Sequence, residues 1–326
     1  MQHFKSILCV VDNGSRDNAT LEQAAKLAEN HQASLTVIEV IDQIPAYAEL
    51  SVNFLSSEKL QAKIVGAHQK RLEELVAPWS KRVKIKPVVL AGIFFITVIR
   101  EVLDNEHDLV LKTVESGGLV NRLFGSNDMH LLRNCPCPVW LIKPTSAQTC
   151  QRILAAVDVS DNYPPDELKI RSLLNNDILE IAGTLALAGS SELHIVDVWN
   201  AIGESALRSG FIARPEEEVV AYVKGVEQQH AQNLDALVEK VFDRLGQDAL
   251  EYIKPEKHLV KGYPRKKVPE LTEKIKADLV VMGTVARTGI PGFFIGNTAE
   301  NILNQLDCSV LAIKPPGFVT PVTLEK

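Results

Sequence analysis

Apolar residues along this chain follow two alternating patterns. Short continuous runs, such as Ile7 to Val11 and Ile153 to Val157, are typical of strands buried on both faces. Between these runs, apolar residues recur at steps of three and four, the spacing of amphipathic helices. The longest such segments run from about Glu58 to Val76 and from about Glu216 to Leu245. Regular alternation of strand and helix predicts an α/β fold with parallel strands joined by right-handed crossovers.

The whole pattern occurs twice. The run CPVWLIKP that starts at Cys137 matches CSVLAIKP, which starts 171 residues later at Cys308. Near the start of each copy, SILCVVD ends at Asp12 and RILAAVD ends at Asp158. We therefore predict two related domains, residues 1–147 and 148–326, each a doubly wound parallel sheet of about five strands.

The predicted domain boundary is a short polar stretch around residues 145–149. It is too short to let the domains drift far apart, so we expect them to pack as a pseudo-dimer. The closing strands, Val139 to Ile142 and Val310 to Ile313, are expected to pair because each would otherwise leave an apolar edge bare. A further dimer of whole chains is left open.

Composition narrows the range of partners and compartments. The 326 residues carry a formal net charge of −6 and no basic stripe, which argues against direct binding of nucleic acid. No signal peptide or membrane span is evident, so we expect a cytoplasmic protein without a membrane partner. Five cysteines without disulfide-framework spacing suit a reducing compartment. Cys135 and Cys137 are interpreted as packing residues, and no metal is expected.

The second copy carries a glycine-containing loop after its predicted fourth strand. Gly283 and Gly289 would let the backbone approach an anion, and Gly296 opens a helix whose free N–H groups favour negative charge. Ligands of doubly wound sheets bind outside the carboxyl ends of the strands, where Asp158 is also predicted to lie. Arg287, inside the loop, is either a phosphate contact or a solvated surface cation.

This loop resembles that of the universal stress protein family in its tandem two-domain form, and the resemblance covers nearly the whole chain. ATP-binding members carry a glycine, two residues, a second glycine, nine residues, and a third glycine followed by serine or threonine. Here the corresponding residues are Gly283, Ala286, Gly296 and Asn297. The resemblance implies a Rossmann-like fold of the adenine nucleotide alpha hydrolase type.

Carried over by residue, the resemblance implies a nucleotide site in the second domain. Asp158 would be the acceptor in the nucleoside pocket, while alanine and asparagine replace the second glycine and the first hydroxyl residue of the motif. The implied nucleotide-binding residues are Ala156, Val157, Asp158, Val198, Met282, Gly283, Ala286, Arg287, Gly289, Gly296, Asn297 and Thr298.

The first copy departs further from the motif. Lys112 and Thr113 stand where the second copy has Met282 and Gly283, and Ser116 replaces the next motif residue. Asp12 is interpreted as a loop cap more readily than as a ligand. The first domain is therefore expected to have a degenerate motif and a structural role.

These features favour a stress-response protein that binds ATP or a related nucleotide in its second domain. The alternative is a scaffold or carrier of a small apolar molecule that uses the same cleft. No nucleophile with its base or paired carboxylates can be identified from spacing, so an enzyme is not expected, although slow ATP hydrolysis and a role for Mg²⁺ are left open. His130 and His194 have no partners at the level of sequence and are interpreted as ordinary helix and strand residues.

Overall fold

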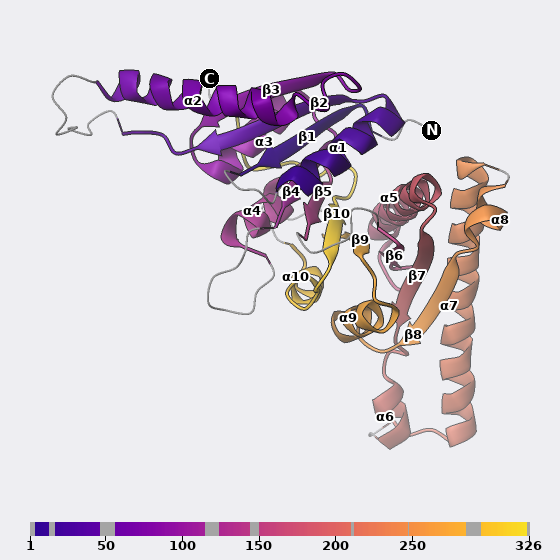
Figure 1. Ribbon diagram of the computed structural model, residues 1–326. Coiled ribbons are helices and arrows are strands. Elements are labelled where there is room, and N and C mark those ends of the chain that lie inside the picture. Colours follow the sequence, from indigo (N-terminus) through magenta and orange to yellow (C-terminus); the bar gives the residue numbers. More distant parts are fainter. Residues whose placement is uncertain are drawn as a thin grey trace. The chain divides into compact units, whose positions relative to one another are not determined.

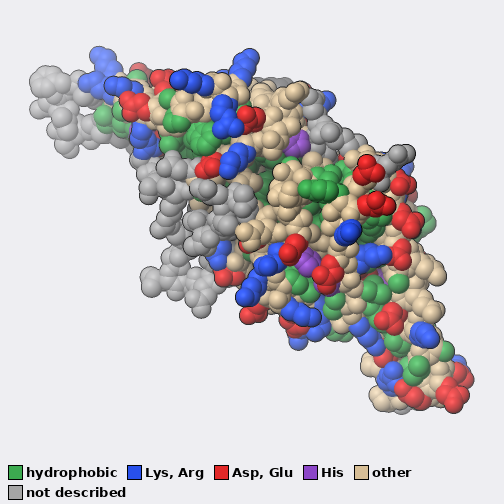
Figure 2. Space-filling view, turned by 45° about the vertical axis from the view of Figure 1, so that its right-hand side comes forward, with side chains coloured by type: hydrophobic (Ala, Val, Ile, Leu, Met, Phe, Trp, Pro, Cys, Tyr) green, Lys and Arg blue, Asp and Glu red, His purple; other side chains and the backbone are tan. Residues whose placement is uncertain are grey.

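The computed structural model describes residues 4–12, 17–45, 56–114, 124–143, 150–209, 212–246, 248–284 and 295–324. It separates into two compact units, both α/β as predicted (Figure 1). Unit 1 comprises Met1–Gln148, Ser309–Ala312 and Val319–Lys326, and unit 2 comprises Thr149–Cys308 and Ile313–Phe318. On the face drawn in Figure 2, acidic and basic side chains of the described residues are interspersed rather than gathered by sign.

Unit 1 is built on a parallel sheet with the order β3-β2-β1-β4-β5. Its strands are β1 (Ser6–Val11), β2 (Ser34–Ile41), β3 (Ile85–Ala91), β4 (Leu109–Thr113) and β5 (Val139–Ile142). Its helices are α1 (Asp17–His31), α2 (Ser57–Val76), α3 (Phe94–Asp104) and α4 (Ser126–Asn134). Strand β4 is buried along its whole length and β1 from its second residue on, which explains their continuous apolar pattern. The strand order reverses between β1 and β4, so the switch point lies at their carboxyl ends.

The closing strand of the second copy, β10 (Ser309–Ile313), pairs antiparallel with β5. Leu311 lies opposite Trp140, and the backbone N–H of Lys143 donates a hydrogen bond of 3.0 Å to Ser309 Oγ. The two closing strands therefore pair with each other, as the sequence predicted. Because β5 also pairs with β4, it has a neighbouring strand on both sides.

Unit 2 repeats the arrangement, with parallel strands in the order β8-β7-β6-β9. Its strands are β6 (Arg152–Val157), β7 (Glu192–Trp199), β8 (Glu256–Lys261) and β9 (Leu279–Gly283). Its helices are α5 (Pro165–Gly189), α6 (Glu204–Ser209), α7 (Glu216–Leu245), α8 (Ala249–Ile253), α9 (Pro264–Ile275) and α10 (Asn297–Leu303). The switch point of this unit lies between β6 and β9, and β8 is the edge strand.

Helices α5 and α7 pack directly on each other. Gly183 of α5 permits the close approach, because a Cβ atom there would lie 2.6 Å from Cδ1 of Leu245. The α7 helix begins after Pro215, whose fixed φ suits a helix start, and it is the longest helix described. Neither α7 nor any other described helix has the length and apolar character needed to cross a membrane.

Candidate functional site

The carboxyl ends of three adjacent strands in unit 2 carry the predicted nucleoside residues. Ala156 of β6 lies opposite Met282 of β9, so Asp158 follows β6 beside the end of β9. On the other side of β6, Val157 lies opposite Asp197 of β7. Six predicted site residues lie at this edge of the sheet: Ala156, Val157, Asp158, Val198, Met282 and Gly283.

Asp158 is held by two side chains that follow it in the sequence. Arg171 Nη1 of α5 lies 2.5 Å from Asp158 Oδ2, and the Tyr163 hydroxyl donates a hydrogen bond of 2.9 Å to the same oxygen. The guanidinium of Arg171 lies over the Tyr163 ring, 3.6 Å from its centroid. Burial, and then the charge of Asp158, raise the pKa of Tyr163 to about 12, so the phenol stays a hydrogen-bond donor at neutral pH. The Asp158 carboxylate is thus fixed in position and paired with a cation.

Helix α5 also holds the backbone of Asp158. Asn175 Oδ1 accepts a hydrogen bond of 3.1 Å from the Asp158 N–H, and Asn175 Nδ2 donates one of 2.6 Å to the Asp158 carbonyl. One turn earlier, Arg171 forms an ion pair with Glu167 at 2.7 Å. Glu167, Arg171 and Asn175 occur at steps of four and share one face of the helix. Sequence reasoning missed them, although this polar i, i+4, i+8 series was visible.

Gly283 has a packing role at the end of β9. A Cβ atom at this position would lie 2.6 Å from Leu174 Cδ2, so only glycine admits the leucine side chain at this distance. Leu174 is itself buried. A ligand that approaches Gly283 on this side must therefore displace the Leu174 side chain.

Side chains of helix α7 also bind the segment that follows β6, both directly and through Asp197 of β7. His230 Nδ1 lies 2.7 Å from Asp197 Oδ2, and both side chains are buried. The other carboxylate oxygen of Asp197 accepts a hydrogen bond of 3.2 Å from the Val159 N–H. Asn233 Nδ2 donates a hydrogen bond of 2.9 Å to the Val159 carbonyl. The hydrogen bond to Asp197 raises the pKa of His230 against the opposing effect of burial.

The predicted phosphate residues lie only partly within the described structure. Helix α10 starts after Gly296, whose N–H donates a hydrogen bond of 2.9 Å to the Thr284 carbonyl. Asn297 and Thr298 are exposed in its first turn. The other three predicted loop residues, Ala286, Arg287 and Gly289, lie outside the described residues.

The switch point of unit 1 contains a buried ion pair instead. Lys112 of β4 is fully buried, and its Nζ donates hydrogen bonds of 3.0 Å to Asp128 Oδ1 and 2.9 Å to the Thr113 carbonyl. Asp12 Oδ2 lies 3.9 Å from the same nitrogen. Asp128 also accepts the Gly125 N–H at 3.0 Å. The ammonium group of Lys112 thus lies beside the carboxylate of Asp12, and Asp12 is the residue that corresponds to Asp158 in unit 2.

Both members of this ion pair are replaced in the second copy. Lys112 corresponds to Met282, and the 171-residue offset that aligns Gly125 with Gly296 places Asp128 opposite Ala299. Met282 and Ala299 are buried and apolar. The two equivalent positions are therefore occupied by a charged pair in the first copy and by apolar residues in the second. Ser116 lies outside the described residues.

The cysteines and histidines singled out in the sequence lie in different surroundings. Cys135 and Cys137 are buried with their sulfurs 3.6 Å apart, and the hydrogen bond between them, with burial, raises the pKa of Cys137 well above its ordinary value. His130 stacks on Phe95 with ring centroids 4.4 Å apart. His194 lies close to Glu256 and His258 of β8, which the sequence could not reveal, and 3.9 Å from Glu192 of its own strand.

Comparison with known proteins identifies the family. The universal stress protein family model matches residues 3–143 and 150–314. The chain is 29% identical over 335 residues to universal stress protein E of Salmonella typhi, covering 100% of this chain and 99% of that protein. It is 28% identical to the universal stress protein E homolog of Haemophilus influenzae over 321 residues, covering 96% and 98%.

Solved structures show the same fold. A functionally unknown protein from Pseudomonas aeruginosa aligns with a TM-score of 0.66 at 23% identity, over 96% of this chain and 94% of that one. A universal stress protein from Archaeoglobus fulgidus aligns with a TM-score of 0.60 at 16% identity, over 96% and 99%. With both halves matched by the family model, this chain belongs to the universal stress protein family.

Proposed function

We propose that this chain is a cytoplasmic stress-response protein whose C-terminal half binds ATP or a related nucleotide. The observation that supports this most strongly is the placement of Asp158 and Gly283. They lie at the ends of neighbouring strands β6 and β9, on the two sides of the switch point, where doubly wound sheets bind their ligands. The proposal assigns the domain of residues 148–326 to nucleotide binding and the domain of residues 1–147 to a structural role.

Asp158 retains the capacity to accept hydrogen bonds from a ribose. Arg171 and Tyr163 both bond to Oδ2, whereas Oδ1 accepts the Ser160 N–H at a longer distance of 3.3 Å. An ionised carboxylate offers about four lone-pair sites, and these three donors leave about one for a ligand hydroxyl. One ribose hydroxyl would donate to Asp158, while Arg171 and Tyr163 hold the carboxylate in place.

The remaining contacts are those that the resemblance to ATP-binding members of the family implies. Val198 is half-buried beside β6 and would line the adenine together with Ala156 and Val157. Met282 and Gly283 would cover the base and sugar. The phosphates are assigned to Ala286, Arg287, Gly289, Gly296, Asn297 and Thr298.

A second candidate is a small apolar molecule in the same cleft. It is favoured by the packing of Leu174 against Gly283, which presents a methyl group where a sugar would approach the backbone. The pairing of Asp158 with Arg171 also reduces the net charge that this site offers to a polar ligand. In this alternative, the protein is a scaffold or carrier.

Calorimetric titration of the full chain with ATP tests the proposal. We expect one site per chain, and Asp158→Ala should weaken binding about 5- to 150-fold, because a lost hydrogen bond to a buried ligand group costs roughly 1–3 kcal/mol. Asp12→Ala is the matched control at the equivalent position of the first copy, and it should leave the affinity unchanged. Equal effects of the two substitutions, or two equivalent sites, would contradict the proposal. Asp158→Asn keeps the side-chain shape if the alanine variant folds poorly.

A further inference from the structure

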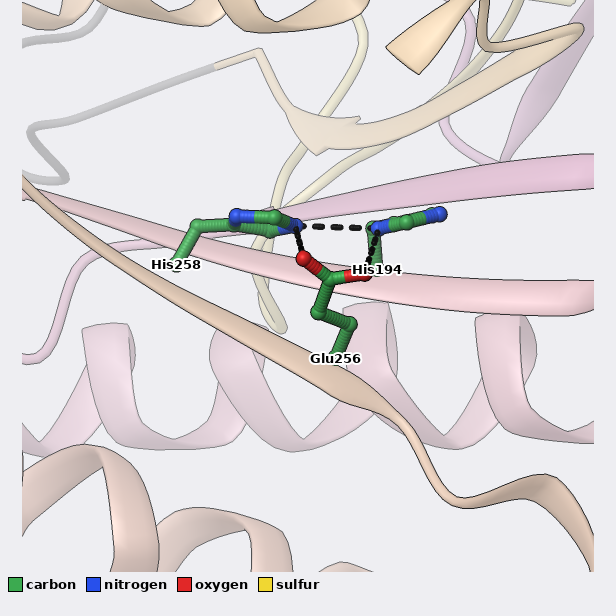
Figure 3. A group of neighbouring side chains, drawn as sticks. All are labelled: His194, Glu256 and His258. Carbon is green, nitrogen blue, oxygen red and sulfur yellow. Dashed lines mark hydrogen bonds and ion pairs between the residues drawn. The ribbon is translucent and has the colours of Figure 1, made fainter.

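Two histidines and a glutamate meet at the end of unit 2 opposite to Asp158. His194 lies near the amino end of β7, and Glu256 and His258 lie on the neighbouring edge strand β8 (Figure 3). His194 is opposite Glu256 in the parallel register, and Glu256 and His258 are two residues apart, so all three share one face of the sheet. Figure 3 shows the Glu256 carboxylate reaching toward both imidazole rings.

The distances between the donor atoms suit a small cation. His194 Nδ1 lies 2.9 Å from His258 Nε2 and 3.5 Å from Glu256 Oε2, and His258 Nε2 lies 3.6 Å from Glu256 Oε1. One ligand atom from each residue lies within 4.8 Å of the others. Tetrahedral zinc with bonds of 2.0–2.1 Å keeps its ligand atoms about 3.3 Å apart, so the three groups need only small movements to coordinate it.

A carboxylate lies near the second ring nitrogen of His194. Coordination through Nδ1 places the proton on Nε2, which is buried and has no hydrogen-bond partner. Glu192 Oε2 lies 3.9 Å from that nitrogen and is itself bonded by Arg152 Nε at 2.9 Å. Metal-bound histidines commonly donate their other N–H to a carboxylate, and Glu192 would accept this hydrogen bond after moving closer to the ring.

The three side chains range from buried to exposed: His194 is buried and His258 is half-buried. Glu256 is 65% exposed, which leaves the cluster open to solvent on one side.

We propose that His194, Glu256 and His258 bind one Zn²⁺ ion, with water in the fourth position. Two imidazoles and one carboxylate form a donor set that zinc uses in proteins, and three protein ligands leave a coordination position open. The ion would link β8 to β7 and so secure the edge strand of unit 2. This site is separate from the proposed nucleotide cleft and does not depend on it.

The test is titration of the metal-free full chain with zinc sulfate, followed by native mass spectrometry and calorimetry. We expect one zinc ion per chain. His194→Gln and His258→Gln should each weaken binding about 100-fold or more, because loss of an outer-shell partner alone costs 10- to 100-fold. His68→Gln is the matched control, because it removes a histidine that contacts a glutamate in unit 1. Its zinc affinity should equal that of the unmodified chain.

Two measurements on the unmodified chain keep the proposal testable if a variant fails to fold. Substitution with Co²⁺ should produce the visible absorption bands of a tetrahedral site, and anomalous diffraction at the zinc edge should place the ion between His194 and His258. Binding of zinc that persists in the double variant His194→Gln/His258→Gln would overturn the proposal. An anomalous peak elsewhere, or no binding at micromolar zinc, would do the same.

Discussion

At the residue scale, the two switch points differ by a pair of charges. Lys112 and Asp128 are both fully buried in unit 1, whereas Met282 and Ala299 occupy the equivalent positions in unit 2. An isolated charge at such a site is costly, so the two residues are expected to change together or not at all. The second copy therefore shows which apolar residues can replace the charged pair of the first copy.

We predict that Lys112→Met destabilises unit 1 by about 3–5 kcal/mol, because it leaves the Asp128 carboxylate buried without its ammonium partner. The double variant Lys112→Met/Asp128→Ala reproduces the second copy and should recover most of this loss. Hydrogen exchange of β4 amides reports the stability of unit 1 separately from unit 2. A double variant as unstable as the sum of its two single variants would show that the residues are not coupled.

Leu174 is the residue whose position bears most directly on ligand access. Leu174→Ala should raise the affinity for ATP about 2- to 10-fold, because a ligand beside Gly283 no longer has to force the leucine from its rotamer. The same change should destabilise the protein, as truncation of a buried leucine does. Leu173→Ala is the control, since its side chain is 43% exposed on the same helix. Unchanged or weaker ATP binding in Leu174→Ala would favour the apolar ligand.

The sequence predicted the strand-end residues of the site but not the side chains that hold them. Asp158 could be placed because the apolar run of β6 stops immediately before it and parallel strands end at a common edge. Tyr163 and Leu174 gave no such signal, and the i, i+4, i+8 series that contains Arg171 did not reveal its partner, because these contacts depend on how the start of α5 packs across β6 and β9. His194 was interpreted as an ordinary strand residue for the same reason, since its partners come from a strand more than 60 residues away.

At the element scale, an acid–histidine pair ties the long helix to the sheet in both units. Glu39 Oε1 of β2 lies 2.8 Å from His68 Nδ1 of α2, and Asp197 of β7 lies 2.7 Å from His230 of α7. The two carboxylates occupy equivalent strand positions in the repeat. In unit 2, the second oxygen of Asp197 also holds the segment after β6, so the pair links α7 to the proposed site.

The Asp197–His230 pair should make the stability of unit 2 depend on pH. Because the folded pKa of His230 is raised, its contribution is fully present below the unfolded value of about 6.5 and is lost as pH rises through the folded value. The stability difference between the unmodified chain and His230→Gln should therefore shrink from about pH 6 upward. Hydrogen exchange of β7 amides at several pH values measures it. His130→Gln, in unit 1, is the control, and a pH-independent difference would contradict the assignment.

The longest helix was predicted closely, whereas two short helices were missed. The pattern from Glu216 to Leu245 matches α7 at both ends, because Pro215 marks its start and the apolar spacing persists along it. Helices α6 and α8 have six and five residues, too few for a periodic signal.

At the scale of the whole molecule, most of the last strand, β10, belongs to unit 1. Residues Ser309–Ala312 belong to that unit through their pairing with β5, although the repeat assigns them to the second copy. The repeat revealed two copies and their closing strands, and the bare-edge argument indicated that these strands pair. Association of the two domains as a pseudo-dimer remains a proposal that this pairing supports.

The pairing predicts that β5 behaves as an interior strand. Amides of Val139–Ile142 should exchange with deuterium as slowly as those of β4, because β4 and β10 flank β5 on its two sides. Strand β3, which ends the strand order, is the internal comparison for an edge strand. Exchange of β5 as fast as that of β3 would contradict the arrangement.

The central claim is that the second half of this chain binds a nucleotide, and native mass spectrometry of the purified full chain tests it most directly. The bound species is weighed in the intact complex and identified after release. We predict one adenine nucleotide per chain, present in Asp12→Ala and lost or strongly reduced in Asp158→Ala. A chain that carries an apolar molecule instead, or that stays empty after incubation with millimolar ATP, would contradict the claim.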